Sequence, residues 1–326
     1  MFCTILFYFV KHLFNYCYDI SCNYINNMLL YFFKWGIYMH FDYKFKEEAL
    51  KNRVLLDGKR YSDFGMMWIG LSNITGIDID TLSMYDDWYI LDNEFYYFKT
   101  AFIFEELFMS ELAKECNVKC VDFLLAENTV LYKYPVFGVI SKIYRTKDKE
   151  YFYYSDFCNR YFGGYVKDMD KFKLASVSAF GNDKSNILMN DIYGLISFDM
   201  FTGQSDRGEH NFMFECDNDN IRLAPLCDNG MVFRNGFNYD SAFGNYCLFE
   251  TDMYTTYRKD LLDILRNERM LYDRFEYILD INVKEVLKRT LDKYKIVMNL
   301  GNRRRVLGYL DCKKRAIDGT LKLSRR

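Results

Sequence analysis

"FTGQSDRGEHNFMFECDNDNIRLAPLCDNG" forms residues 201–230, and this segment carries the strongest signal for both fold and function. It places Asp206 five residues before Asn211, and Asp228 follows beyond two short apolar runs. Those runs, NFMFEC and IRLAPLC, are typical of strands, and the polar DNDN between them is typical of a turn. Turn formation alone also explains these side chains, because Asp and Asn bond readily to nearby backbone groups.

Phosphoryl transfer gives a second explanation for the same three side chains. It needs a carboxylate that orients the attacking hydroxyl and accepts its proton, and it needs oxygen ligands for Mg²⁺. Asp206 matches the first requirement, and Asn211 and Asp228 match the second. The D-x-x-x-x-N spacing by itself arises by chance in a chain so rich in Asp and Asn. This interpretation therefore depends on what the rest of the chain supplies.

An upstream strand and helix supply a basic and an acidic residue in a suitable order. Residues 86–99 read as two strands around the turn LDNE, and the second strand ends at Lys99. Apolar residues at i, i+3 and i+4 spacing predict an amphipathic helix over 103–112, which contains Glu106. A strand lysine paired with a helix glutamate holds ATP phosphates in protein kinases. Taken alone the pair is weak, because a lysine at a strand end usually only reaches water.

The segment WIGLSNITGID precedes this pair of strands and contains Gly70 and Ser72. A loop that covers a nucleotide would lie at this point of the chain, so both residues are candidates for nucleotide binding. The spacing does not match G-x-G-x-x-G, however, and an ordinary turn explains the segment equally well.

The order of these elements predicts an α+β, two-lobed, protein-kinase-like fold. Residues 39–145 are expected to form a small β-rich lobe with one helix, and residues 146–326 a larger, mostly helical lobe with a basic C-terminal tail. Helical periodicity over 186–201 and 256–300 supports this division, because both segments follow the break near residue 145. Further strands are expected within 121–144.

The segment TGQSDRGEHNFMFE…IRLAPLCDNG resembles the HipA-like serine/threonine kinases. Their catalytic loop reads D-x-H/R-x-x-N and is followed by a hairpin and an APLYD element. Two other segments, GVISKIY at 138–144 and FEELFMSELAKECNV, resemble further elements of that family. The resemblance spans about residues 88–232, and the catalytic segment is its most specific part.

The resemblance implies a role for each candidate residue, with ATP and Mg²⁺ as cofactors. It makes Asp206 the catalytic aspartate, and it makes Asn211 and Asp228 metal ligands. Lys99 would contact the nucleotide phosphates, with Glu106 as its ion-pair partner. Where the family often has histidine this chain has glycine, a change that removes no essential group.

Two classes of function follow. The first is a kinase that transfers phosphate from ATP to a Ser or Thr hydroxyl of a protein, with autophosphorylation as its simplest readout; a lipid or small-molecule hydroxyl stays open. The second is a nucleotide-binding pseudokinase or toxin-like module that acts through a protein partner. The missing glycine-rich loop favours the second class, whereas retention of Asp206, Asn211 and Asp228 favours the first. An antitoxin-like partner is a further expectation from the resemblance.

Composition restricts partners and location. The net charge is −2, so direct binding to nucleic acid is not expected. The apolar and aromatic residues 1–38 form runs too short to span a bilayer. They are interpreted as a membrane-surface anchor, as a packed arm or as an extension upstream of a true start at Met39, and the last two are favoured. A cytoplasmic protein is expected.

Overall fold

The computed structural model describes most of the chain beyond residue 40. The chain divides into two compact units, Met1–Tyr38 and Met39–Arg326, and all described residues belong to the second. Among them, no helix combines the length and the apolar character needed to cross a membrane. The described residues are 41, 43–51, 53–56, 87–91, 94–100, 102–128, 136–142, 144, 146, 148–166, 169–204, 207, 212–217, 220–230, 232–233 and 265–325.

A five-stranded sheet carries Lys99. Its strands are β2 (Val54–Leu56), β3 (Asp87–Leu91), β4 (Glu94–Lys99), β5 (Phe123–Asn128) and β6 (Val136–Lys142). They stand in the order β2-β5-β6-β4-β3, and neighbours are antiparallel except for β2 and β5. The predicted strand pair before Lys99 is therefore confirmed as β3 and β4, and the strands expected within 121–144 are β5 and β6.

Gly138 explains how the end of β4 can lie so close to β6. A Cβ atom at this position would lie 2.4 Å from the carbonyl oxygen of Lys99 and 2.5 Å from the ring of Phe98. Both distances are far inside van der Waals contact, so only glycine fits here without a shift of the strands. The glycine therefore fixes the backbone of Lys99 against the centre of the sheet.

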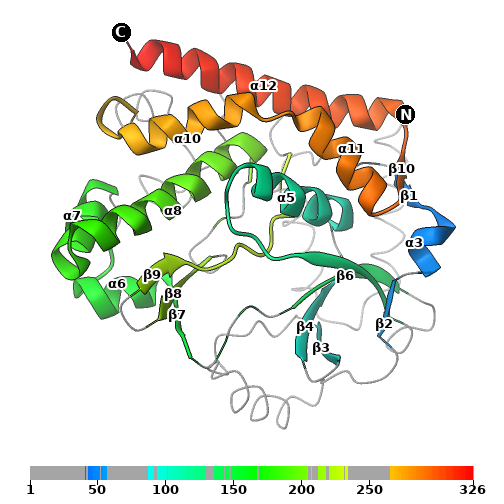
Figure 1. The fold of residues 1–326 in the computed structure, drawn as a ribbon, viewed down its shortest axis with the longest axis horizontal. Coiled ribbons are helices and arrows are strands. Elements are labelled where there is room, and N and C mark those ends of the chain that lie inside the picture. The colour runs from blue at the N-terminus through cyan, green and yellow to red at the C-terminus, as the bar shows by residue number, and fades with distance from the viewer. Residues whose placement is uncertain are drawn as a thin grey trace, which may run out of the picture. The chain divides into compact units, whose positions relative to one another are not determined.

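Helix α5 (Ile103–Glu115) follows directly after β4 and packs against the sheet and against α11 (Val283–Lys293). Figure 1 shows α5 between the sheet and the helices of the C-terminal part. Ten consecutive residues, from Phe104 to Ala113, are buried. The predicted helix is confirmed, but it does not have the single apolar face that the spacing suggests, because neighbouring elements enclose it on all sides.

Helices dominate the second half of the chain, as predicted. They pack with α5 around one continuous apolar core. Two strands are expected within 211–216 and 221–227 around the turn 217–220; they form as β8 and β9, although the second ends already at Leu223, and they join β7 in a three-stranded sheet. The elements are β7 (Glu150–Tyr153), α6 (Tyr154–Phe162), α7 (Met169–Phe180), α8 (Asn182–Thr202), β8 (Met213–Asp217), β9 (Asn220–Leu223), α10 (Arg269–Asp280), α11, β10 (Ile296–Met298) and α12 (Leu300–Ser324).

One part of the helical prediction over 256–300 is wrong. Residues 296–298 form strand β10, which pairs antiparallel with β1 (Tyr43–Phe45), so that Tyr43 lies opposite Met298. Helix α3 (Glu47–Lys51) follows β1. The pairing partner of β10 lies about 250 residues earlier in the chain, so a local helical period could not reveal it.

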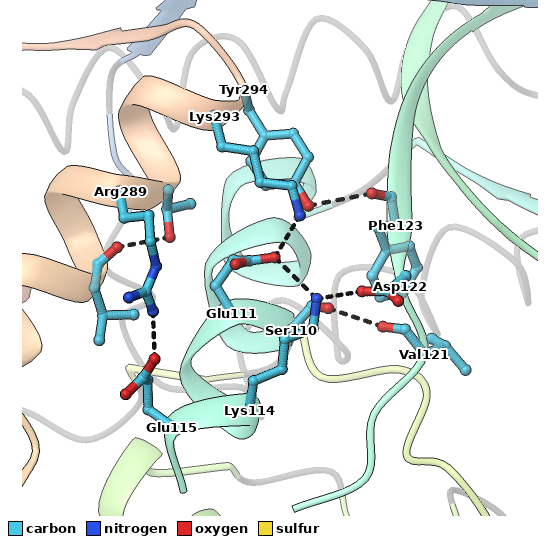
Figure 2. Close-up of polar contacts among 12 residues, drawn as sticks. Ser110, Glu111, Lys114, Glu115, Val121, Asp122, Phe123, Arg289, Lys293 and Tyr294 are labelled. Atoms are coloured by element: carbon cyan, nitrogen blue, oxygen red, sulfur yellow. Dashed lines mark hydrogen bonds and ion pairs between the residues drawn. The ribbon is translucent and has the colours of Figure 1, made fainter. Parts of the chain in front are cut away.

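Polar contacts join the far end of α5 to α11 (Figure 2). Glu111 accepts a hydrogen bond from Lys293 at 2.7 Å, and Glu115 accepts one from Arg289 at 2.6 Å. The hydroxyl of Tyr294 donates to a backbone carbonyl of β5 at 3.2 Å. Helix α5 is thereby tied to α11, and the end of α11 is in turn bonded to the sheet.

Candidate active site

The candidate site centres on the ammonium group of Lys99 at the end of β4. Its Nζ donates hydrogen bonds to Glu106 Oε1 and to Asp228 Oδ1. Burial alone would lower the pKa of Lys99, but the charges of Glu106 and Asp228 outweigh it and hold this pKa above its usual value. Lys99 is therefore a fixed positive charge at neutral pH.

Glu106 is fully buried and receives three donors. Besides Lys99, the backbone N–H of Asn229 donates to its Oε2 at 3.0 Å, and the N–H of Gly230 donates to its Oε1 at 2.9 Å. A buried carboxylate is costly unless such charge-assisted bonds satisfy it. Glu106 therefore connects α5 to the Asp228–Gly230 segment as well as to β4.

The two adjacent glutamates, Glu105 and Glu106, have different surroundings. Burial, with a smaller contribution from the charge of Glu106, raises the pKa of Glu105 to about 7. The hydrogen bonds to Lys99 and to the backbone beyond Asp228 come from Glu106. Of the two adjacent glutamates, Glu106 is thus the partner that the sequence order predicted for Lys99.

Gly230 allows the close approach between α5 and the loop. A Cβ atom here would lie 2.6 Å from the Cβ of Phe102 and 3.0 Å from Glu106 Oε1. A larger residue would push the loop away from the carboxylate that its N–H contacts. The glycine in the CDNG sequence is therefore required for packing, in addition to any part in a turn.

Asp228 has the most open side chain of the three, at 38% exposed. Its backbone lies in the left-handed region with φ of 54°, which aspartate tolerates better than most residues. Its carbonyl accepts a hydrogen bond from Gln204 Nε2 at 3.2 Å. The carboxylate thus stays partly accessible while the backbone behind it is held by Gln204, which lies two residues beyond the end of α8.

The other predicted site residues lie outside the described residues. These are Asp206, Asn211, Gly70 and Ser72, so their roles stay predictions. Of the seven candidates, the structure brings together Lys99, Glu106 and Asp228, which come from a strand, a helix and a loop.

Sequence reasoning missed four residues that hold the chain on either side of Asp228. Arg207 and Asp199 form a buried ion pair, and Asn229 and Cys120 contact each other. Arg207 follows the predicted catalytic aspartate directly, which was the one available signal for it. An arginine in a polar segment is usually exposed to solvent, so the sequence does not predict its burial.

The residues present fit a Mg²⁺-nucleotide. Mg²⁺ takes few protein ligands, commonly one or two carboxylates with the phosphates completing its shell, and a partly open Asp228 suits this. Lys99 supplies a fixed positive charge suited to phosphate. Within the described part of the chain, no group of three or more His, Cys, Asp or Glu residues could bind a metal by itself.

Comparison with known proteins places the fold. No protein-family model and no curated protein sequence matches this chain. Its structure is similar to that of the Helicobacter pylori proinflammatory kinase CtkA, with a TM-score of 0.56 and 17% identity over 73% of this chain and 90% of that one. A Shewanella oneidensis MR-1 HipA, crystallised with HipB and operator DNA, gives a TM-score of 0.45 and 13% identity over 71% of this chain and 60% of that one.

At this level of identity the similarity to CtkA concerns the fold alone. It confirms the predicted α+β class, with a small β-sheet region and a helical region arranged as in kinases. The kinase-like fold that the sequence resemblance implies is therefore shared with CtkA.

Proposed function

We propose that this protein is a kinase that transfers the γ-phosphoryl group of ATP to a Ser or Thr hydroxyl of a protein. One observation carries the proposal: Lys99 contacts both Glu106 and Asp228, which stem from distant parts of the chain. A purely structural ion cluster would also bury these charges. Here, however, the cluster stands in a kinase-like fold, and Asp228 keeps a partly open carboxylate.

Each residue has a distinct part in this proposal. Lys99 would bind the phosphates, and Glu106 would hold Lys99 in place. Asp228, with Asn211, would hold Mg²⁺, which neutralises phosphate charge when bound. Asp206 would orient the acceptor hydroxyl and accept its proton. Most of the catalytic effect would come from positioning and electrostatics, because phosphoryl transfer requires little covalent chemistry from the protein.

The test separates metal binding from catalysis with two variants, Asp206→Asn and Asp228→Ala. The protein is incubated with labelled ATP and Mg²⁺, and phosphorylation of the chain is read by mass spectrometry alongside Mg-ATP affinity and melting temperature. Asp228→Ala should weaken both affinity and transfer. Asp206→Asn should lower transfer roughly 10² to 10⁴-fold with nearly unchanged affinity, because a general base acts in the transition state.

Two outcomes would contradict the proposal. If both variants transfer phosphate at the parent rate, these residues only form turns. If the parent binds Mg-ATP without any transfer to itself or to a protein acceptor, the chain is a nucleotide-binding module and not a kinase. A protein as the acceptor, an antitoxin-like partner and a cytoplasmic location stay predictions from the sequence.

A further inference from the structure

Arg207 makes hydrogen bonds to three residues, although its side chain is only 2% exposed. Toward α8, its Nε and Nη2 donate to the two carboxylate oxygens of Asp199 at 3.0 and 3.1 Å. Toward the loop after β9, its Nη2 donates to Asn229 Oδ1 at 2.6 Å and its Nη1 donates to the carbonyl of Cys227 at 3.2 Å.

The two loop contacts lie on either side of Asp228 in the chain. Cys227 is bound through its carbonyl and Asn229 through its side chain, so one guanidinium group contacts both neighbours of the proposed metal ligand. The amide of Asn229 also donates to Cys120 Sγ at 3.2 Å, and its backbone N–H donates to Glu106. Arg207 itself directly follows the proposed catalytic aspartate in the sequence.

The simplest alternative is that Arg207 only forms a structural ion pair with Asp199. Buried ion pairs add little net stability, since desolvation of the two charges offsets their attraction. The pair with Asp199 alone would need only two of the five guanidinium donors. The other donors reach the loop on both sides of Asp228, which a planar fork can do and a lysine ammonium cannot.

On the premise of the proposed kinase function, we propose that Arg207 is a positioning residue: it fixes the metal-binding loop at residues 227–229 to the C-terminal end of α8. Through this link the loop that carries Asp228 and the segment that carries Asp206 share one buried anchor. Arg207 acts through Asp228 and is not expected to contact the nucleotide.

The chain offers a control for this residue. Arg222 forms the same two-bond ion pair with Asp191, at 2.6 and 2.9 Å, and among the described residues its side chain makes no hydrogen bond to the loop around Asp228. The variants Arg207→Lys and Arg222→Lys therefore both replace a two-bond arginine pair by lysine. Only the first removes contacts to the neighbours of Asp228.

Two measurements on the full chain test the proposal. The first titrates Mg²⁺ at fixed ATP and reads nucleotide binding; Arg207→Lys should need roughly 10-fold more Mg²⁺, because residues that orient metal ligands typically affect metal affinity by this factor or more. The second follows hydrogen exchange at the amides of Asn229 and Gly230, which should lose protection. Arg222→Lys should change neither, although both variants are expected to lower the melting temperature.

The results separate this proposal from the function on which it rests. An unchanged Mg²⁺ midpoint in a folded Arg207→Lys protein, or unchanged exchange at these amides, overturns the positioning role. If the parent binds no Mg-ATP, the proposed function fails, and the exchange comparison alone then judges the role of Arg207. Should Arg207→Lys not fold, Asn229→Ala removes one loop contact and keeps the pair with Asp199; it must shift the Mg²⁺ midpoint in the same direction, or the proposal is wrong.

Discussion

Both ends of α5 carry an ion pair, but the two pairs differ in how far they are buried. At its start, Glu106 pairs with Lys99, and their side chains are 0% and 13% exposed. At its far end, Glu115 pairs with Arg289, and these side chains are 43% and 46% exposed. Glu111 and Lys293 lie between these extremes, since only the carboxylate is buried.

Burial should decide what each pair contributes. Near the surface, water competes for both charges, and an ion pair is worth about 0 to 1 kcal/mol. In the interior, loss of one partner leaves an uncompensated charge, which costs about 3 to 5 kcal/mol. Substitutions at the near end of α5 should therefore destabilise the protein more than those at the far end, and under the proposed function they should also lower activity.

The largest difference between the two ends of α5, in activity and in stability, is expected when Lys99 and Lys293 are each replaced. Lys99→Met should reduce phosphoryl transfer by about 10² to 10³-fold, since loss of one preorganised electrostatic group has effects of this size. It should also lower the free energy of unfolding by about 3 kcal/mol, because Glu106 keeps its backbone donors but loses its cation. Transfer rates and chemical denaturation of the folded variants measure both effects.

Lys293→Met is the matched control at the far end. It should leave the transfer rate unchanged and cost about 1 kcal/mol at most, since Lys114 still donates to Glu111 at 3.2 Å. An equal loss of activity in the two variants would show that the position of α5 as a whole, and not the charge of Lys99, limits the reaction.

The next largest effect on stability is expected for two glycine-to-alanine substitutions. Gly230→Ala should destabilise the protein by about 1 to 3 kcal/mol, the usual cost of overpacking, because the new methyl group meets Phe102 and Glu106. Gly308→Ala, within α12 and with no atom within 4 Å of the added Cβ, should instead stabilise it by about 0.5 to 1 kcal/mol. Melting curves decide this, and opposite signs are required.

The sequence predicted the near end of α5 better than the far end. Lys99, Glu106 and Asp228 are predicted because they follow one another along the chain in the order found in kinases. This order of residues can be recognised even where the spacing between them does not match a motif. The links to Arg289 and Lys293 join segments about 175 residues apart, and ordinary surface charges give no pattern that reveals such a contact.

Two other features were hidden from the sequence for related reasons. Strand β10 is set by its pairing with β1, which is a tertiary effect that overrides local helical periodicity. The burial of Arg207 depends on Asp199, which lies on a helix where an acidic residue would normally face water. Local patterns therefore gave the element types, but not which charged residues are enclosed.

Acid pH should reveal an intermediate effect at Glu111. Burial alone would raise the pKa of this carboxyl, but hydrogen bonds from Lys293 and Lys114 outweigh it and lower the pKa below 4.5. Because the folded-state pKa is the lower one, the group stabilises the protein above about pH 4.5, and this contribution is lost as the pH falls through the folded-state value. In the Glu111→Gln variant, the free energy of unfolding should therefore fall less steeply as the pH is lowered from about 5. Denaturation measured at a series of acidic pH values checks this.

The smallest effect is expected for the pair between Arg289 and Glu115, where both side chains are nearly half exposed. A double-mutant cycle with Arg289→Gln and Glu115→Gln should give a coupling free energy of about 0.2 to 1 kcal/mol. Salt should reduce it further, because exposed charges are screened over about 10 Å at 0.1 M ionic strength. The same cycle with Lys99→Met and Glu106→Gln should give a clearly larger coupling that salt changes little, because that pair is largely shielded from water. Equal couplings at the two ends would mean that burial does not set the difference, and the assignment of function to the near end of α5 would then rest on the position of Asp228 alone.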